Sequence, residues 1–141
     1  MFSKATEYAL RAVIYIAQKS SEEKKLGLPE IARAINTPRS FTAKILQQLT
    51  SGKKIIQSST GPGGGFFIAE RAKKLPVRVI LEVMEKDYVL DKCVLGLKKC
   101  SEASACPMHS EYKHIKVKLK ELFESKTIQD LANELEWTRI H

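Results

Sequence analysis

The stretch LPEIARAINTPRSFTAKILQQLTSGKKIIQSSTGPGGGFFIA, residues 28–69, decides the fold of this 141-residue chain. Its first part has apolar residues at helical spacing in two segments, 28–35 and 38–50, each with a proline near its start. Its second part has two strand-forming runs, 54–59 and 66–69, joined by the glycine-rich turn TGPGGG. The stretch therefore predicts two short helices followed by a β-hairpin.

The flanking sequence is mainly helical by the same criterion. Helices are expected over residues 3–18, 76–86, 107–125 and 128–136, and Ser3 is the expected N-cap of the first. Thr37 is the expected N-cap of the helix 38–50, and Thr127 and Asp130 are expected to form a capping box for the helix 128–136. The segment between the second and third of these helices has no helical or strand period and is expected to be a loop. We therefore predict a mainly α fold with a small β-hairpin wing: a winged helix-turn-helix followed by a long C-terminal helix.

Positive charge is concentrated in the first part of the chain. Residues 1–86 carry 15 Lys and Arg against 7 Asp and Glu, whereas residues 87–141 carry 9 of each, so the net charge of +8 belongs to the first part. Such a basic region indicates a polyanionic partner, although an ordinary basic surface is the alternative. We predict a DNA-binding domain at 1–86, a cysteine-bearing sensor loop at 87–106, and a dimerisation helix with a C-terminal helix at 107–141.

Several classes of protein are disfavoured by composition and motifs. Hydrophobic residues make up 43% of the chain, which argues against disorder, and no apolar run approaches the ~20 residues that a membrane span needs. The opening MFSKATEYAL lacks a signal-peptide core, so a cytoplasmic protein is expected. No Ser/His/Asp or Cys/His set has catalytic spacing, so no enzyme is expected, and a small redox enzyme is the distant alternative.

The segment 38–50 is the expected recognition helix. Phe41, Ile45 and Leu49 recur every four residues and are expected to face the core. A helix that reads the major groove needs short polar and cationic side chains on its outer face. A solvated polar face is the alternative. The residues expected to contact DNA from this helix are Arg39, Ser40, Thr42, Lys44 and Gln47.

The hairpin turn is the second expected DNA contact. Its small residues let backbone N–H groups approach phosphates or the edge of the minor groove. A flexible turn with no ligand is the alternative, and a nucleotide-binding P-loop is excluded because no Gly-Lys-Ser/Thr follows. The expected contacts are Thr60, Gly61, Gly63 and Gly64.

Three cysteines, Cys93, Cys100 and Cys106, follow the spacing C-x6-C-x5-C, which differs from the close pairs of zinc knuckles. Thiolates bind soft metals and iron–sulfur clusters, so an iron–sulfur cluster is the expected cofactor. A cluster normally takes four protein ligands. His109 can supply the fourth, and Glu7 or a residue of a second chain is the alternative. Three buried thiols, or a redox-active pair, is the interpretation without a cluster.

A heptad stripe runs along the segment 107–125. Its members are spaced 4, 3, 4 and 3 residues apart, which is typical of a helix that pairs with another helix. A homodimer joined through this segment is therefore expected. The stripe consists of Met108, Tyr112, Ile115, Leu119 and Leu122.

The motifs KATEYALR (4–11), SFTAKILQQL (40–49), GPGGG (61–65) and the cysteine loop ending in CPMH occur in one order. Together they resemble the Rrf-two family of winged-helix transcription regulators, over essentially the whole chain. The resemblance implies a homodimer on a roughly palindromic operator. It places Ser40 and Lys44 at DNA-contacting positions, and the three cysteines at the positions of the family's cluster ligands.

The resemblance leaves the type of sensor open. His109 matches the histidine that completes a 2Fe–2S site in IscR-like members, and Glu7 matches an acidic residue that reaches a 4Fe–4S cluster from the partner subunit in NsrR-like members. Thr60 stands where IscR-like members often have arginine, and Ala43 replaces an acidic residue of some members. The implied function is a bacterial regulator that senses redox, nitric oxide or iron–sulfur status. The alternative is a cluster-free, CymR-like regulator controlled by a partner protein or by thiol oxidation.

Overall fold

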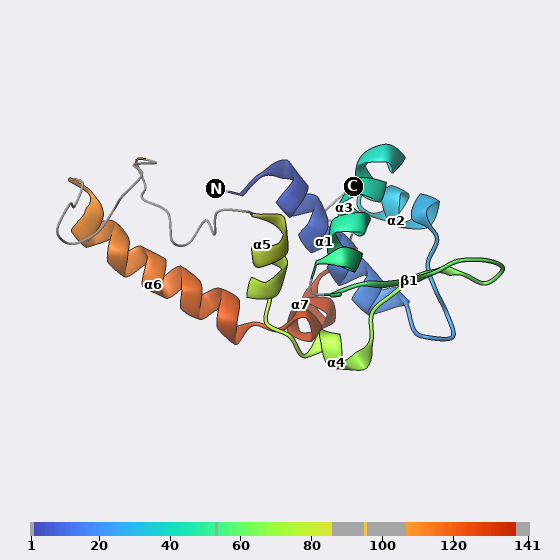
Figure 1. Cartoon of the computed structure of the whole chain (residues 1–141). Helices are drawn as coiled ribbons and strands as arrows, with labels where there is room; N and C mark the ends of the chain where they lie inside the picture. The colour runs from blue at the N-terminus through green and yellow to red at the C-terminus, as the bar shows by residue number, and fades with distance from the viewer. Residues whose placement is uncertain (1, 53, 86–94, 96–106, 138–141) are drawn as a thin grey trace.

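The computed structural model describes residues 2–52, 54–85, 95 and 107–137. Figure 1 shows that α6 projects to one side of a head formed by the other elements. The predicted mainly α fold with a β-hairpin is confirmed within these residues. The elements are α1 Lys4–Lys19, α2 Leu28–Ala34, α3 Arg39–Ser51, β1 Gln57–Ser59, β2 Gly65–Phe67, α4 Glu70–Lys73, α5 Arg78–Met84, α6 His109–Ser125 and α7 Ile128–Glu134.

Helix α1 lies at the centre of the head. Ser3 is its N-cap, as predicted, and its hydroxyl accepts a hydrogen bond of 3.2 Å from the amide of Thr6. Ala9, Ala12 and Ile16 are fully buried along one side. Because α1 contacts α2, α3, α5, α7 and β2, this one helix sets the position of most of the head.

The turn between α2 and α3 differs from the prediction at Thr37. This residue was expected to cap α3, but it is buried and its hydroxyl donates to the carbonyl of Ile35 at 3.3 Å. Pro38 occupies the N-cap position, so α3 starts at Arg39 without a side-chain cap. Asn36 has φ of 56°, a left-handed conformation that asparagine tolerates better than most residues.

The wing is shorter than the predicted strands. Its antiparallel register pairs Gln57 with Phe67 and Ser59 with Gly65. The prediction included residues 54–56 in the first strand, but Ile55 and Ile56 are fully buried in the core that α3 and α5 share. The chain enters that core through Lys54, which has a φ of 49°.

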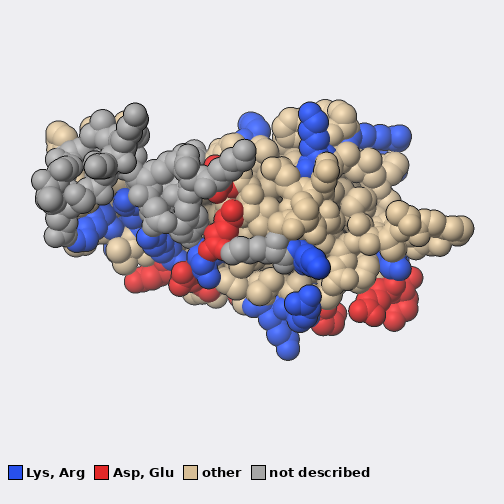
Figure 2. All heavy atoms as spheres, viewed as in Figure 1, with Lys and Arg blue, Asp and Glu red and all other residues tan. Residues whose placement is uncertain are grey.

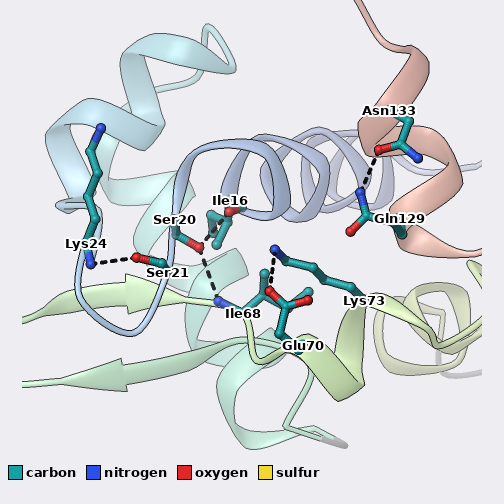
Figure 3. A network of polar contacts seen from close by, with 9 residues as sticks. All are labelled: Ile16, Ser20, Ser21, Lys24, Ile68, Glu70, Lys73, Gln129 and Asn133. Atoms are coloured by element: carbon teal, nitrogen blue, oxygen red, sulfur yellow. Dashed lines mark hydrogen bonds and ion pairs between the residues drawn. The ribbon is translucent and has the colours of Figure 1, made fainter.

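Two contacts fasten the wing to the rest of the head. Leu26 and Phe66 exchange two backbone hydrogen bonds of 2.8 Å, which join the segment before α2 to β2. The buried hydroxyl of Ser20 donates to the carbonyl of Ile16 at 2.6 Å and accepts from the amide of Ile68 at 3.3 Å, as Figure 3 shows. The end of α1 therefore holds the segment that leaves the wing.

The prediction missed α4, which follows this segment. It is a single turn in which Glu70 and Lys73 form an ion pair of 3.1 Å, drawn in Figure 3. A helix of four residues has too few apolar positions to show a period in the sequence.

Helix α7 and the residues after it pack on α1. Ile128 and Ala132 belong to the same core as the buried side of α1. The side-chain amide of Gln18 donates to the carbonyls of Ala132 at 2.7 Å and Leu135 at 3.1 Å. Trp137 in turn donates its indole N–H to the side-chain oxygen of Gln18. The last described segment is thus tied to the first helix.

Helix α6 is joined to the head at its C-terminal end. The amide of Val77 donates to the carbonyl of Lys126 at 2.8 Å, and Arg78 Nε forms an ion pair of 3.2 Å with Glu124 Oε1. No residue of α6 is buried in the part of the chain that the structure describes. None of the described helices is both long enough and apolar enough to cross a membrane.

The predicted capping box at the start of α7 is confirmed. The hydroxyl of Thr127 accepts from the amide of Asp130 at 3.0 Å, and the carboxylate of Asp130 accepts from the amide of Thr127 at 2.9 Å. These hydrogen bonds favour the charged carboxylate, chiefly the bond from the backbone of Thr127, so the pKa of Asp130 lies below its ordinary value.

We expect Asp130→Ala to lower the thermal midpoint at about pH 7 because the capping box loses the hydrogen bond from the amide of Thr127 to the carboxylate. The lowered pKa means that the carboxylate stabilises the fold above its ordinary pKa, and that this contribution is lost as pH falls through the lower native value. The difference from wild type should therefore shrink below about pH 4. Thermal melts followed by circular dichroism at several pH values measure it. Glu134→Ala, at the other end of the same helix, is the control, and an equal loss in that variant would contradict the capping role.

Candidate nucleic-acid interface

The outward face of α3 carries polar and cationic side chains. Arg39, Ser40, Lys44 and Gln47 are all exposed, while Ile45, Leu46 and Leu49 are buried on the opposite side. Figure 2 shows Lys and Arg side chains projecting over the part of the head where α2 and α3 lie in Figure 1. The surface offers hydrogen-bond donors, acceptors and positive charge together, which is the combination that base edges and phosphates need.

Two neighbouring residues of α3 exchange the places predicted for them. Thr42 was expected to contact DNA, but it is fully buried and its hydroxyl donates to the carbonyl of Pro38 at 2.9 Å. Because this bond satisfies the hydroxyl, threonine can lie in the core, and the prediction for Thr42 is wrong. Phe41 was expected in the core, but its side chain is 42% exposed.

The wing tip has the backbone that its glycines predict. Thr60, Gly61 and Gly63 are exposed, and the two glycines have φ of 85° and 74°. Gly64 donates its amide to the carbonyl of Gly61 at 2.9 Å. A Cβ at Gly64 would lie 2.5 Å from the carbonyl oxygen of Ser59, so this turn excludes any larger residue there.

A cleft of about 520 Å³ opens at the turn between α2 and α3. Arg33 of α2 and Arg39 of α3 both line it, and neither guanidinium forms an ion pair or hydrogen bond with the described residues. Sequence reasoning missed Arg33, because the left-handed turn at Asn36 is what brings two arginines six positions apart to one cleft. The cleft has the size and charge to take a backbone phosphate of DNA.

A second cationic cleft, of about 380 Å³, lies between the end of α3 and the wing. Lys54 and Arg71 line it together with Thr50, Gln57 and Ser58. Arg71 belongs to α4, the helix that the sequence pattern did not reveal, so no local motif pointed to this residue. Positive charge therefore lies near both ends of α3.

Helix α2 is held to α1 on its other side. The Tyr15 hydroxyl donates to Glu30 at 3.5 Å. Burial raises the pKa of Tyr15, and the negative charge of Glu30 acts in the same direction. Tyr15 therefore remains protonated and keeps its hydrogen-bond donor at neutral pH.

The predicted cluster ligands are only partly visible. Cys93, Cys100 and Cys106 lie outside the described residues, and the described residues contain no group of three potential metal ligands. His109 is the half-buried first residue of α6, and Glu7 lies in the first turn of α1, 3.2 Å from Lys4 in an ion pair. The start of α6 and the start of α1 are separated in Figure 1.

Comparison with known proteins identifies the family. The Rrf2 (Rrf-two) family, described as iron-dependent transcriptional regulator, matches residues 2–134. The chain belongs to the Rrf2 family. A protein of Aquifex aeolicus named as an HTH-type transcriptional regulator is 33% identical over 135 residues, which cover 94% of this chain and 92% of that protein. NsrR of Oceanobacillus iheyensis is 26% identical, over 91% of this chain and 86% of its own.

Solved structures of Rrf2 proteins share the fold. CymR of B. subtilis, described as its global cysteine regulator, superposes with a TM-score of 0.79 at 20% identity, over 96% of this chain and 98% of its own. IscR of T. potens superposes with a TM-score of 0.72 at 20% identity, over 100% and 92%. As an Rrf2 protein, the chain is a DNA-binding transcription regulator and not an enzyme. The winged helix-turn-helix predicted from the sequence is thereby confirmed.

The cleft between α2 and α3 generates a prediction for this Rrf2 regulator. Arg33→Ala and Arg39→Ala should each weaken DNA binding on all sequences. Each should also reduce the slope of log affinity against log salt by about one for each subunit bound, because each subunit loses one phosphate contact. Fluorescence anisotropy over a salt series measures the slope. Lys118→Ala removes an exposed charge from α6, the helix that projects from the head in Figure 1, and should leave the slope unchanged. Equal slopes in wild type and both arginine variants would contradict the phosphate site.

Proposed function

We propose that the chain is a homodimeric regulator that binds an inverted-repeat operator through α3 and the wing of each subunit, and that an iron–sulfur cluster on Cys93, Cys100 and Cys106 controls binding. The observation that carries the DNA part is the exposed face of Ser40, Lys44 and Gln47 on α3. That face is flanked by two cationic clefts and by a glycine turn with exposed backbone. In each subunit α3 would enter the major groove, and the wing would contact the adjacent backbone.

The heptad stripe of α6 supports the homodimer. Met108, Ile115 and Leu122 are 49%, 53% and 49% exposed. These residues share one side of a helix that projects from the head, as Figure 1 shows. A second copy of α6 would bury the same stripe from both chains, which is how a two-fold symmetric interface forms.

The three cysteine residues suit a cluster because thiolates are the preferred ligands of iron–sulfur centres. His109 lies three positions after Cys106 at the start of α6, and Glu7 of the partner subunit is the alternative fourth ligand. When bound, the cluster supplies a redox-active group that oxidants and nitric oxide attack. The residues of this chain would hold it and transmit its state.

Contacts made by the elements before and after the cysteine segment support that transmission. Before the segment, the Glu85 carboxylate accepts from the hydroxyl of Thr6 at 2.8 Å and the amide of Ser3 at 3.3 Å, at the start of α1. After the segment, α6 reaches α5 through the ion pair of Arg78 and Glu124. A change in the length or shape of the cysteine segment would therefore act on α1, which packs on α3, and on α6.

The DNA and dimer parts can be tested with one pair of variants. Wild type should bind an inverted repeat selected from random DNA, with two chains per site. Lys44→Ala should weaken this binding at least tenfold, because two subunits each lose a contact to a base or phosphate, at about 1 kcal/mol per contact.

Ile115→Glu should abolish the dimer in analytical ultracentrifugation and weaken operator binding. Val117→Glu is the matched control, because Val117 is 48% exposed on α6 but lies outside the stripe. A wild type that selects no sequence would contradict the proposed DNA function, and a dimeric Ile115→Glu would contradict the proposed interface.

The cluster has a separate test. Protein purified without oxygen should be coloured and contain iron and sulfide, and Cys100→Ser should lose both. His109→Ala should change the absorption spectrum if histidine is the fourth ligand, with His114→Ala on the same helix as the control. Loss of the spectrum in Glu7→Ala would assign the ligand to Glu7. A colourless wild type that still binds its operator would overturn the cluster and favour control by a partner protein or thiol oxidation.

A further inference from the structure

Phe41 is an exposed aromatic residue on a helix whose neighbouring exposed residues are polar. Large apolar side chains that are exposed are rare in the described part of the chain, and the others all lie at residue 95 or beyond. Within residues 2–52 and 54–85, Phe41 is the one such side chain. A partner that covered this ring would add the free energy of its burial to binding.

The ring of Phe41 is held in place from one side. It meets the ring of Tyr8 edge to face, with centroids 5.7 Å apart and planes at 85°. Arg11 lies over the other part of this stack, with its guanidinium carbon 5.6 Å from the centroid of Tyr8. Arg11 also donates to the carbonyl of Ile35, at 3.5 Å. The stack contacts Phe41 while leaving 42% of its side chain exposed.

Phe41 borders the polar face of α3. It follows Ser40 directly and lies three positions before Lys44, one helical turn away. The exposed Gln48 lies two turns further along the same side. An apolar ring therefore stands beside the donors and cations that would meet the major groove.

The major groove offers one apolar group, the 5-methyl of thymine, which phenylalanine can contact. We propose that Phe41 reads a thymine by packing its ring on that methyl group, and so adds a specificity contact to the polar ones. This inference rests on the proposed DNA function. It is favoured over burial by a second copy of the chain, because the stripe proposed to pair lies on α6, away from α3 in Figure 1. Lys44, which lies one helical turn from the ring on the same side of α3, also favours a polyanion.

The test uses an operator selected by the wild-type protein, in which each thymine in turn is replaced by deoxyuridine. This exchange removes only the methyl group. For wild type, replacing one particular thymine in each half-site should lower the affinity about fourfold per methyl group removed. This is the value expected for the loss of one buried apolar carbon. In Phe41→Ala the same replacement should cost nothing, while the costs at other thymines stay as in wild type.

Gln48→Ala is the control, because it changes an exposed residue on the same side of α3 and should keep the fourfold cost. If every replacement costs the same in Phe41→Ala as in wild type, the thymine contact is overturned. If Phe41→Ala instead weakens the dimer, the ring is covered by a second copy and the inference is likewise overturned. Both outcomes leave operator binding by wild type standing, whereas a wild type that selects no operator would remove the proposed DNA function itself.

Discussion

The burial of α1 is the constraint on which the rest of the structure depends. Ala9 and Ala12 present only methyl groups at its buried side, so neighbouring elements can approach its backbone closely. The helix contacts α3, which carries the proposed DNA-contacting face, and α5, which leads into the cysteine segment. A shift of α1 would therefore move the helix proposed to meet DNA and the helix that leads to the proposed sensor together. Close packing makes such a core respond as a body rather than yield locally.

The sequence predicted the fold well because local signals and packing agree over most of the chain. Ser3 caps α1, the Thr127–Asp130 box starts α7, and Gly61 and Gly63 adopt the left-handed backbone that the wing turn needs. Each of these features depends on residues a few positions apart, so a linear pattern is enough to find it.

The errors arise where the folded chain departs from the local apolar pattern. Apolar spacing placed Phe41 in the core, but Thr42 is buried instead, because its hydroxyl is satisfied by the carbonyl of Pro38. Residues 54–56 resemble a strand, yet the core takes their isoleucines. Arg33 and Arg71 reach their clefts only through the folded chain, and spacing along the sequence could not identify them.

The hydrogen bond from Trp137 to Gln18 determines when the head can complete its fold during synthesis. The ribosome makes α1 first and α7 after α6, so a nascent chain that has released only the winged helix-turn-helix leaves one side of α1 exposed to water. Contacts between such distant segments form late and slowly. The head completes its core only once the helix proposed for pairing has also emerged. A newly made chain would therefore become able to bind DNA and to dimerise at nearly the same time. An incomplete chain still on the ribosome would rarely bind an operator as a monomer.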